Sequence, residues 1–301
     1  MVIFTLSVLR KLGLVLFIAG LSQSAMAQLA PQKTVILIPG FFNSATSNYF
    51  SDRIVQLLKS QNLNVVVPTG MNPVGTIEEN GEHVLKILNQ VRATYPNTEI
   101  NIIAHSAGGL YSLYAINHGA YFVNQLITMS TPYDGLEFIE AWRKYSTEFR
   151  LITDISYIQG LRQLTKPYVR KFLATVKVPR TLKVYAYGGH QLRSIEVLDA
   201  ENLPAPFLVP AAFTTGDTDG IVSFQSSTET TLIRTLEKTF IKVQSEKKLF
   251  IALDHWEQVI DYNHFTFLGI QNTQVVQDRQ SDFYLFLAQQ IIKNQQTGET
   301  L

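Results

Sequence analysis

Short apolar runs rich in β-branched residues alternate along this chain with segments of helical periodicity. This alternation is typical of an α/β fold, in which helices flank a mostly parallel central sheet. With 301 residues, of which 46% are hydrophobic, the chain can bury one large core. The predicted strands cover 35–38, 63–67, 100–104, 126–130, 182–187 and 249–253, and the predicted helices cover 51–60, 77–95, the stretch up to 119 and 281–293.

The predicted strand at 100–104 runs directly into a turn made of very small residues around Ser106. A serine on a sharp turn between strand and helix exposes its hydroxyl above the sheet edge, beside backbone N–H groups. Ala104 and Gly108 lie two residues before and after the serine, where a larger side chain would clash. We therefore predict that Ser106 is a nucleophile.

A serine hydroxyl is a weak nucleophile unless a base activates it and an acid orients that base. The segment 214–223 supplies two candidate acids, Asp217 and Asp219. We favour Asp219, because it lies directly before Gly220 and a strand-like apolar pair. The alternative is that both aspartates only shape the loop through hydrogen bonds to nearby backbone N–H groups.

Two histidines occupy positions where the base is expected, downstream of the acid. His264 lies in a loop-like stretch close before the last predicted helix, and His255 directly follows the predicted strand at 249–253. We favour His264 and keep His255 as the alternative base. His105, beside the nucleophile, is expected to support the turn and not to transfer protons.

A tetrahedral oxyanion needs two preorganised hydrogen-bond donors. The backbone N–H of Ala107, immediately after the nucleophile, is one candidate. The other is the N–H of Phe41, in the loop after the first strand, where Gly40 permits a tight turn. The alternative is that Gly40 only turns the chain.

Taken together, these segments resemble the α/β-hydrolase superfamily, and within it the bacterial secreted lipases and esterases. The resemblance implies that Ser106 is the nucleophile, Asp219 the acid and a downstream histidine the base, with a mobile cap over an acyl-chain pocket. Pro39 stands where the family usually has histidine, whereas the spacing after His264 matches the family's histidine loops. The motifs that carry the resemblance are AHSAGGL at 104–110, IPGFF at 38–42, STPYDG at 130–135 and TDGIVS at 218–223.

The stretch 135–178 is aromatic-rich and basic, and it is longer than a crossover between neighbouring strands requires. We predict that it forms a helical cap over the carboxyl edge of the sheet, where ligands bind in such folds; an ordinary helical crossover is the alternative. The chain has no cysteine, which excludes disulfides and thiolate metal sites. No cofactor is expected. A structural calcium ion is the alternative, although neither His255 nor His264 has the surrounding carboxylates typical of calcium-dependent lipases.

The first 27 residues have the pattern of a secretory signal peptide. A basic pair at 10–11 precedes an apolar run at 12–21, and small residues end the segment at Ala27. A bilayer-spanning helix needs about 20 apolar residues, so cleavage after Ala27 is favoured over an uncleaved anchor. We predict a single α/β-hydrolase domain at 28–301 that is secreted or periplasmic.

A net charge of +1 argues against nucleic-acid binding. We predict a secreted serine ester hydrolase that cleaves carboxylic esters of lipids through an acyl-enzyme. Its partners would be a lipid or small ester substrate and, transiently, a membrane or lipid interface. The alternatives are a non-catalytic binding protein of the same fold, and a thioesterase or acyltransferase that uses the same residues. The order of the serine, acid and histidine along the chain favours an enzyme over a binding protein.

Overall fold

The computed structural model describes residues 33–41, 49–137, 139, 159–189, 219, 221–228, 250–251, 255, 258–259 and 274–293. The predicted leader at 1–27 lies outside the described residues, so its cleavage remains a prediction. No helix within the described ranges is long and apolar enough to cross a membrane.

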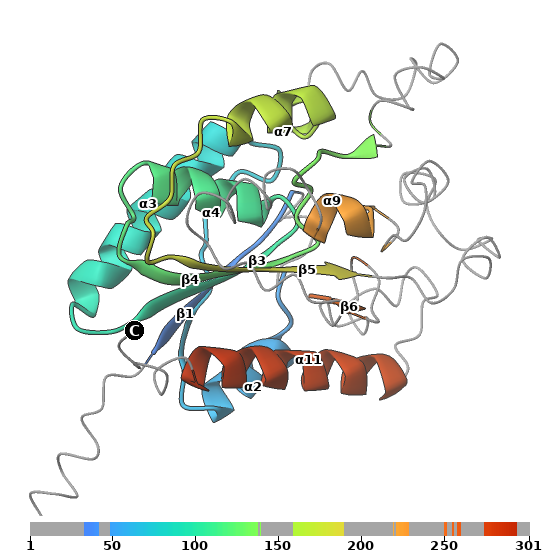
Figure 1. Cartoon of the computed structure of the whole chain (residues 1–301). Coiled ribbons are helices and arrows are strands. Elements are labelled where there is room, and N and C mark those ends of the chain that lie inside the picture. The colour runs from blue at the N-terminus through green and yellow to red at the C-terminus, as the bar shows by residue number, and fades with distance from the viewer. Residues whose placement is uncertain are drawn as a thin grey trace, which may run out of the picture. The chain divides into compact units, whose positions relative to one another are not determined.

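Within the described residues, six parallel strands form the central sheet, in the order β2-β1-β3-β4-β5-β6 (Figure 1). Each lies where the sequence predicts a strand, so the expected α/β class is confirmed. The inner strands are buried on both faces, which explains why they read as continuous apolar runs. The strands are β1 (Thr34–Ile38), β2 (Asn64–Val66), β3 (Ile100–His105), β4 (Val123–Met129), β5 (Lys183–Gly189) and β6 (Phe250–Ile251).

Helices cover both faces of the sheet, with α3, α4 and α7 on one side and α2 and α11 on the other (Figure 1). Alternate residues of one strand supply the two cores: Ile36 packs in the cluster with α3 and α4, whereas Val35 and Leu37 pack in the cluster with α2 and α11. The helices are α2 (Asp52–Ser60), α3 (Ile77–Thr94), α4 (Gly108–Asn117), α6 (Gln159–Gln163), α7 (Lys166–Leu173), α9 (Phe224–Thr228) and α11 (Gln274–Lys293).

Helix α11 begins at Gln274, seven residues before the predicted start at 281. Its first turns are tied to α2 by Arg53, whose guanidinium donates to the Gln277 carbonyl at 2.8 Å and to the Gln280 side chain. These partners are more than 220 positions apart in the chain. Long-range contacts therefore stabilise the part of the helix that its own apolar pattern does not indicate.

The described part of the predicted cap is packed into the main core. The buried cluster that includes α3 and α4 also contains Leu161 of α6 and Val169 and Leu173 of α7. At Gly160 an added Cβ would lie 2.2 Å from the Gly75 carbonyl oxygen, so α6 packs directly against the backbone at Gly75. The cap expected at 135–178 is thus not confirmed, since 159–178 is a fixed part of the domain and 140–158 lies outside the described residues.

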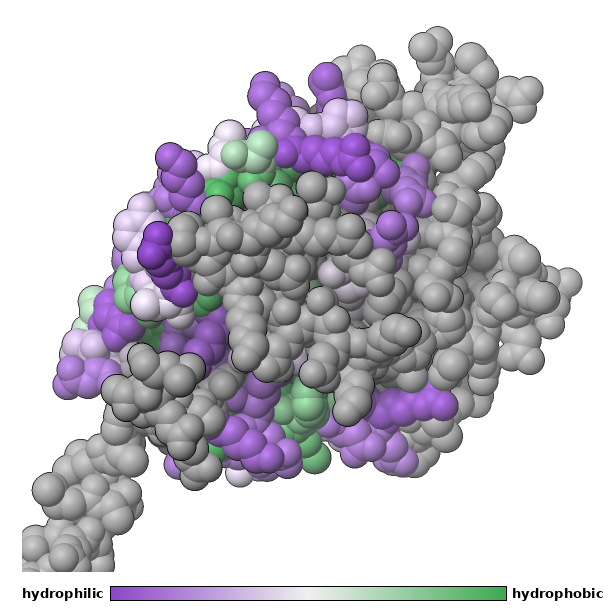
Figure 2. Space-filling model, viewed as in Figure 1, coloured by the Kyte–Doolittle hydropathy of each residue, from purple (hydrophilic) through white to green (hydrophobic). Residues whose placement is uncertain are grey.

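The described surface is mostly hydrophilic on the face shown in Figure 2, with small apolar areas between polar side chains. The large apolar side chains that are exposed come from several separate segments. They are Val67, Val74, Tyr95, Tyr121, Phe286 and Ile292.

The strand order places a switch point between β1 and β3, because β2 lies on the other side of β1. At such a point the connections leave the two carboxyl ends in opposite directions and open a crevice for ligands. Gly40 follows β1, and Ser106 follows β3. The predicted nucleophile is therefore located where this fold class binds ligands.

Candidate active site

Ser106 occupies a strained turn between β3 and α4. Its φ of 54° lies in the left-handed region, which costs a residue other than glycine about 1–2 kcal/mol. Two hydrogen bonds hold the turn against the segment that follows: the Ser106 N–H donates to the Met129 carbonyl at 2.8 Å, and the Thr131 hydroxyl donates to the Ser106 carbonyl at 2.8 Å. The structure therefore confirms the sharp strand-to-helix turn that the sequence predicts.

The small residues around the turn are required by close backbone approach. At Gly108 an added Cβ would lie 2.6 Å from the carbonyl oxygens of both Ile38 and Pro39, which would push α4 away from β1. At Gly40 it would lie 2.6 Å from the Ser106 Cβ. The loop after β1 and the nucleophile turn are therefore in direct contact.

Both predicted oxyanion donors belong to these contacting segments. Ala107 is the N-cap of α4, and the first N–H groups of a helix have no partner within it. Phe41 is buried and directly follows Gly40. The two segments that carry the predicted donors thus meet at the strand ends beside Ser106.

A buried acid and a buried histidine meet at the same carboxyl edge of the sheet. Asp219 Oδ2 lies 2.8 Å from His255 Nδ1, and the His255 N–H donates to the Asp219 carbonyl at 2.9 Å. The alternative base, His255, is thus the histidine that the described residues pair with the predicted acid. His264 and the alternative acid Asp217 lie outside the described residues.

The two oxygens of the Asp219 carboxylate have different hydrogen-bond partners. Oδ1 accepts from the N–H groups of Ile221 at 3.0 Å and Val222 at 2.8 Å, so the loop-shaping role considered above is real. Oδ2 faces His255. Burial raises the pKa of Asp219, but the His255 ring and the hydrogen bonds from His255, Ser130 and Val222 outweigh it, and the pKa falls to about 2.

His105 lies beside the pair formed by Asp219 and His255 and is not part of it. Its Nδ1 is 2.7 Å from the Tyr49 hydroxyl, and its ring centroid is 4.4 Å from that of His255, with the planes tilted by 51°. Burial lowers the pKa of His105 well below its usual value, and His255 lowers it further. A neutral, fully buried imidazole agrees with the expected supporting role.

Two further polar residues of the site were not singled out from the sequence. Ser130, with a φ of 50°, follows β4, and its Oγ accepts from the Gly189 N–H at 3.1 Å and the Gln258 side-chain amide at 2.9 Å. Gln258 also donates to Asp219 Oδ2 at 3.3 Å. Ser130 is the first residue of the STPYDG segment and directly follows β4, which lies beside β3. This position is the sequence signal that could have indicated a role in the site.

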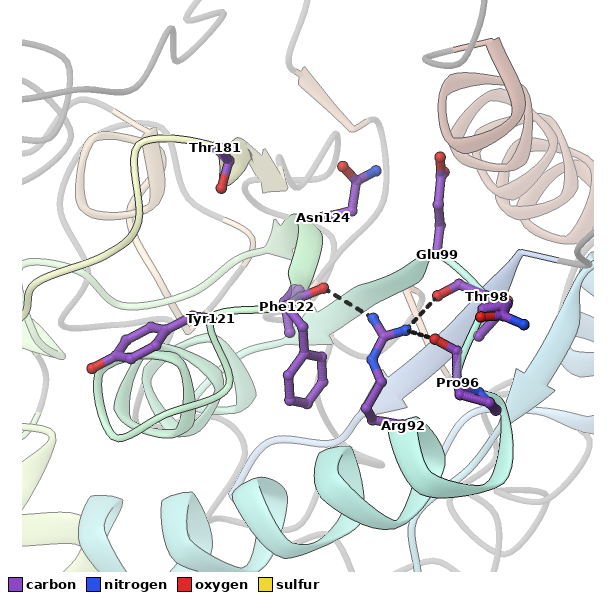
Figure 3. Close-up of a pocket in the computed structure, with 10 residues that line it drawn as sticks. Arg92, Pro96, Thr98, Glu99, Tyr121, Phe122, Asn124 and Thr181 are labelled. Carbon is purple, nitrogen blue, oxygen red and sulfur yellow. Dashed lines mark hydrogen bonds between the residues drawn. The ribbon is translucent and has the colours of Figure 1, made fainter.

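A cavity of about 340 Å³ lies at the opposite edge of the sheet, near the first residues of β3 and β4 (Figure 3). The Arg92 guanidinium beside it donates to the carbonyls of Pro96, Thr98 and Phe122 at 2.8, 3.0 and 3.4 Å. Arg92 therefore serves to hold the ends of α3 and β4 together. Within the described residues no group of three or more His, Asp or Glu side chains is arranged to hold a metal ion.

Residues 33–232 match the family model described as the alpha/beta hydrolase fold. The chain belongs to this family. No protein of curated function matches the chain in sequence.

Solved structures with this fold include bacterial lipases and an esterase. The mature lipase BlEst2 of Bacillus licheniformis is 15% identical, with a TM-score of 0.54 over 75% of this chain and 86% of that one. The metagenomic carboxyl esterase MGS0156 is 14% identical, with a TM-score of 0.62 over 88% and 77%. The Staphylococcus hyicus lipase is 10% identical, with a TM-score of 0.55 over 89% and 97%. The architecture is thus similar to that of lipases and esterases.

Proposed function

We propose that the protein is a serine ester hydrolase in which Ser106 is the nucleophile, His255 the base and Asp219 the acid. The observation that carries the proposal is the buried pair of Asp219 and His255 at the edge of the sheet where Ser106 stands on a strained turn. A carboxylate that accepts from Nδ1 fixes the tautomer in which the other imidazole nitrogen, Nε2, is the base.

The reaction follows from these roles. His255 Nε2 takes the Ser106 proton while Oγ attacks the ester carbonyl, and the N–H groups of Ala107 and Phe41 stabilise the oxyanion. The carbonyl reforms as His255 protonates the departing alcohol, which leaves an acyl-enzyme. Water, activated by the same histidine, then releases the acid and restores Ser106. Asp219 stays ionised throughout and stabilises the imidazolium.

Carboxylic esters of lipids are the proposed substrates. The similar solved structures, which are two lipases and a carboxyl esterase, support this class. The predicted leader at 1–27 places the enzyme outside the cytoplasm, where it would meet lipid at a membrane or other interface. Thioester hydrolysis and acyl transfer would use the same three residues.

Hydrolysis of p-nitrophenyl esters by the mature chain tests the proposal. Ser106→Ala should lower kcat by at least about 10³, because the nucleophile and its base act as a unit. Ser112→Ala is the matched control, since Ser112 is a buried serine of α4 whose hydroxyl donates to the Gly108 carbonyl at 2.7 Å, within its own helix. Turnover within tenfold of wild type after Ser106→Ala would contradict the assignment. A series of acyl lengths from acetate to palmitate then separates a lipase, with higher rates on long and insoluble esters, from a small-ester esterase.

A further inference from the structure

Ser130 and Gln258 form a buried polar pair behind the Asp219 carboxylate. Gln258 is completely buried, and its side-chain amide reaches both Ser130 Oγ, at 2.9 Å, and Asp219 Oδ2, at 3.3 Å. The Ser130 hydroxyl, equally buried, donates to Gln258 Oε1 at 3.0 Å. The proposed mechanism uses neither residue, although Gln258 contacts the acid.

The hydrogen-bond capacity of the Ser130 hydroxyl determines the direction of these bonds. Its oxygen accepts from the Gly189 N–H at 3.1 Å and from the Gln258 amide, which uses both lone pairs. Its single proton goes to Gln258 Oε1, at 3.0 Å. Ser130 thereby holds the Gln258 side chain, whose amide donates to Asp219 Oδ2 at 3.3 Å. Oδ2 of Asp219 therefore has the Gln258 amide as a partner besides His255.

The backbone holds both donors in place. The Ser130 N–H donates to the Tyr187 carbonyl at 2.8 Å, which fixes the residue between β4 and β5. The Gln258 carbonyl accepts from the Tyr284 hydroxyl of α11 at 2.9 Å. The carbonyl of the next residue, Val259, accepts from the Ser51 N–H at 2.9 Å. Donors that are fixed to three separate elements can hold a carboxylate in one orientation.

We propose that Ser130 and Gln258 are positioning residues, which hold the Asp219 carboxylate ionised with Oδ2 directed at His255 Nδ1. This inference rests on the proposed function. The Gln258 amide also shares the charge of the Asp219 carboxylate, so removing this amide leaves more of that charge directed at the His255 ring. Among the described residues, the other ionisable side chains around the pair are His105, Tyr49 and Tyr284, which are buried and neutral over this range.

The test is ester hydrolysis by Ser130→Ala and Gln258→Met as a function of pH. Each substitution should lower kcat about tenfold, the effect of one charge-assisted hydrogen bond on the barrier. KM should stay within about threefold, because neither residue meets the substrate. The acid limb of the kcat/KM profile should move to higher pH, since a carboxylate with fewer donors binds the imidazolium more strongly. The double variant should lose less than the product of the two single effects, because Ser130 acts on the carboxylate through Gln258.

Two matched controls report the cost of losing any buried polar group. Ser112→Ala removes a buried hydroxyl of α4, and Gln125→Met removes a buried amide at the start of β4, at the far end of that strand from Ser130. Both controls should keep the wild-type pH profile. Thermal unfolding identifies variants that do not fold. The activity and pH profile of whichever of Ser130→Ala and Gln258→Met folds then test the positioning role.

An unchanged acid limb, or a loss of activity no greater than that of the controls, overturns the positioning role. Asp219→Asn separates this failure from failure of the proposed function. If Asp219→Asn abolishes turnover while Ser130→Ala and Gln258→Met behave as the controls do, only the positioning inference is wrong. If Asp219→Asn leaves turnover intact, the proposed triad itself is wrong.

Discussion

Replacing Asp219 by asparagine should change how stability depends on pH. The pKa of Asp219 falls from 3.8 to about 2 in the fold, and one pKa unit corresponds to about 1.4 kcal/mol. The ionised carboxylate thus contributes about 2 kcal/mol to the free energy of unfolding. Because the pKa is lower in the folded state than in the unfolded state, this contribution is complete above about pH 4 and is lost as the pH falls towards 2.

The assay is urea unfolding of the wild type and Asp219→Asn at a series of pH values from 7 to 2. The stability difference between the two proteins should be about 2 kcal/mol larger at pH 7 than at pH 2. Asp282→Asn, on the exposed face of α11, is the control for replacing a carboxylate by an amide at the surface. A difference between wild type and Asp219→Asn that is constant, or that grows as the pH falls, would refute the reasoning.

Two further predictions concern the base and the nucleophile turn. His255→Ala should lower kcat on p-nitrophenyl esters by about 10³ or more, and His264→Ala should cost much less; the reverse ranking would assign the base to His264. Gly109→Ala places a Cβ 2.2 Å from Thr131 Oγ1, so urea unfolding should show a loss of about 1–3 kcal/mol. A loss below about 0.5 kcal/mol, the usual range of a surface substitution, would mean that α4 can move away from Thr131 at little cost.

Much of the fold could be predicted because its signals are local. The run that became β3 (Ile100–His105) was predicted as 100–104, and α3 (Ile77–Thr94) was predicted as 77–95. The start of α11 was missed because Arg53, far away in sequence, stabilises its first turns. The cap prediction rested on length and composition, which do not tell whether apolar side chains such as Leu161 and Val169 pack into the main core.

The candidate site was predictable only in part, for a related reason. Ser106 and its small neighbours form a local pattern, and so does the turn at Asp219. The partner of Asp219 depends on how the segment after β6 returns to the sheet edge, which two histidines at allowed positions do not determine. Ser130 and Gln258 lie 128 positions apart, and neither has a local pattern that indicates a contact with the acid.

Labelling of the mature protein with a fluorophosphonate, followed by peptide mapping, tests the central claim most directly. Such a reagent reacts with a serine whose hydroxyl is activated by a neighbouring base. The account predicts one adduct per chain, on Ser106, that is absent in Ser106→Ala and forms far more slowly in His255→Ala. A protein that stays unlabelled, or that carries the adduct on another residue, would contradict it.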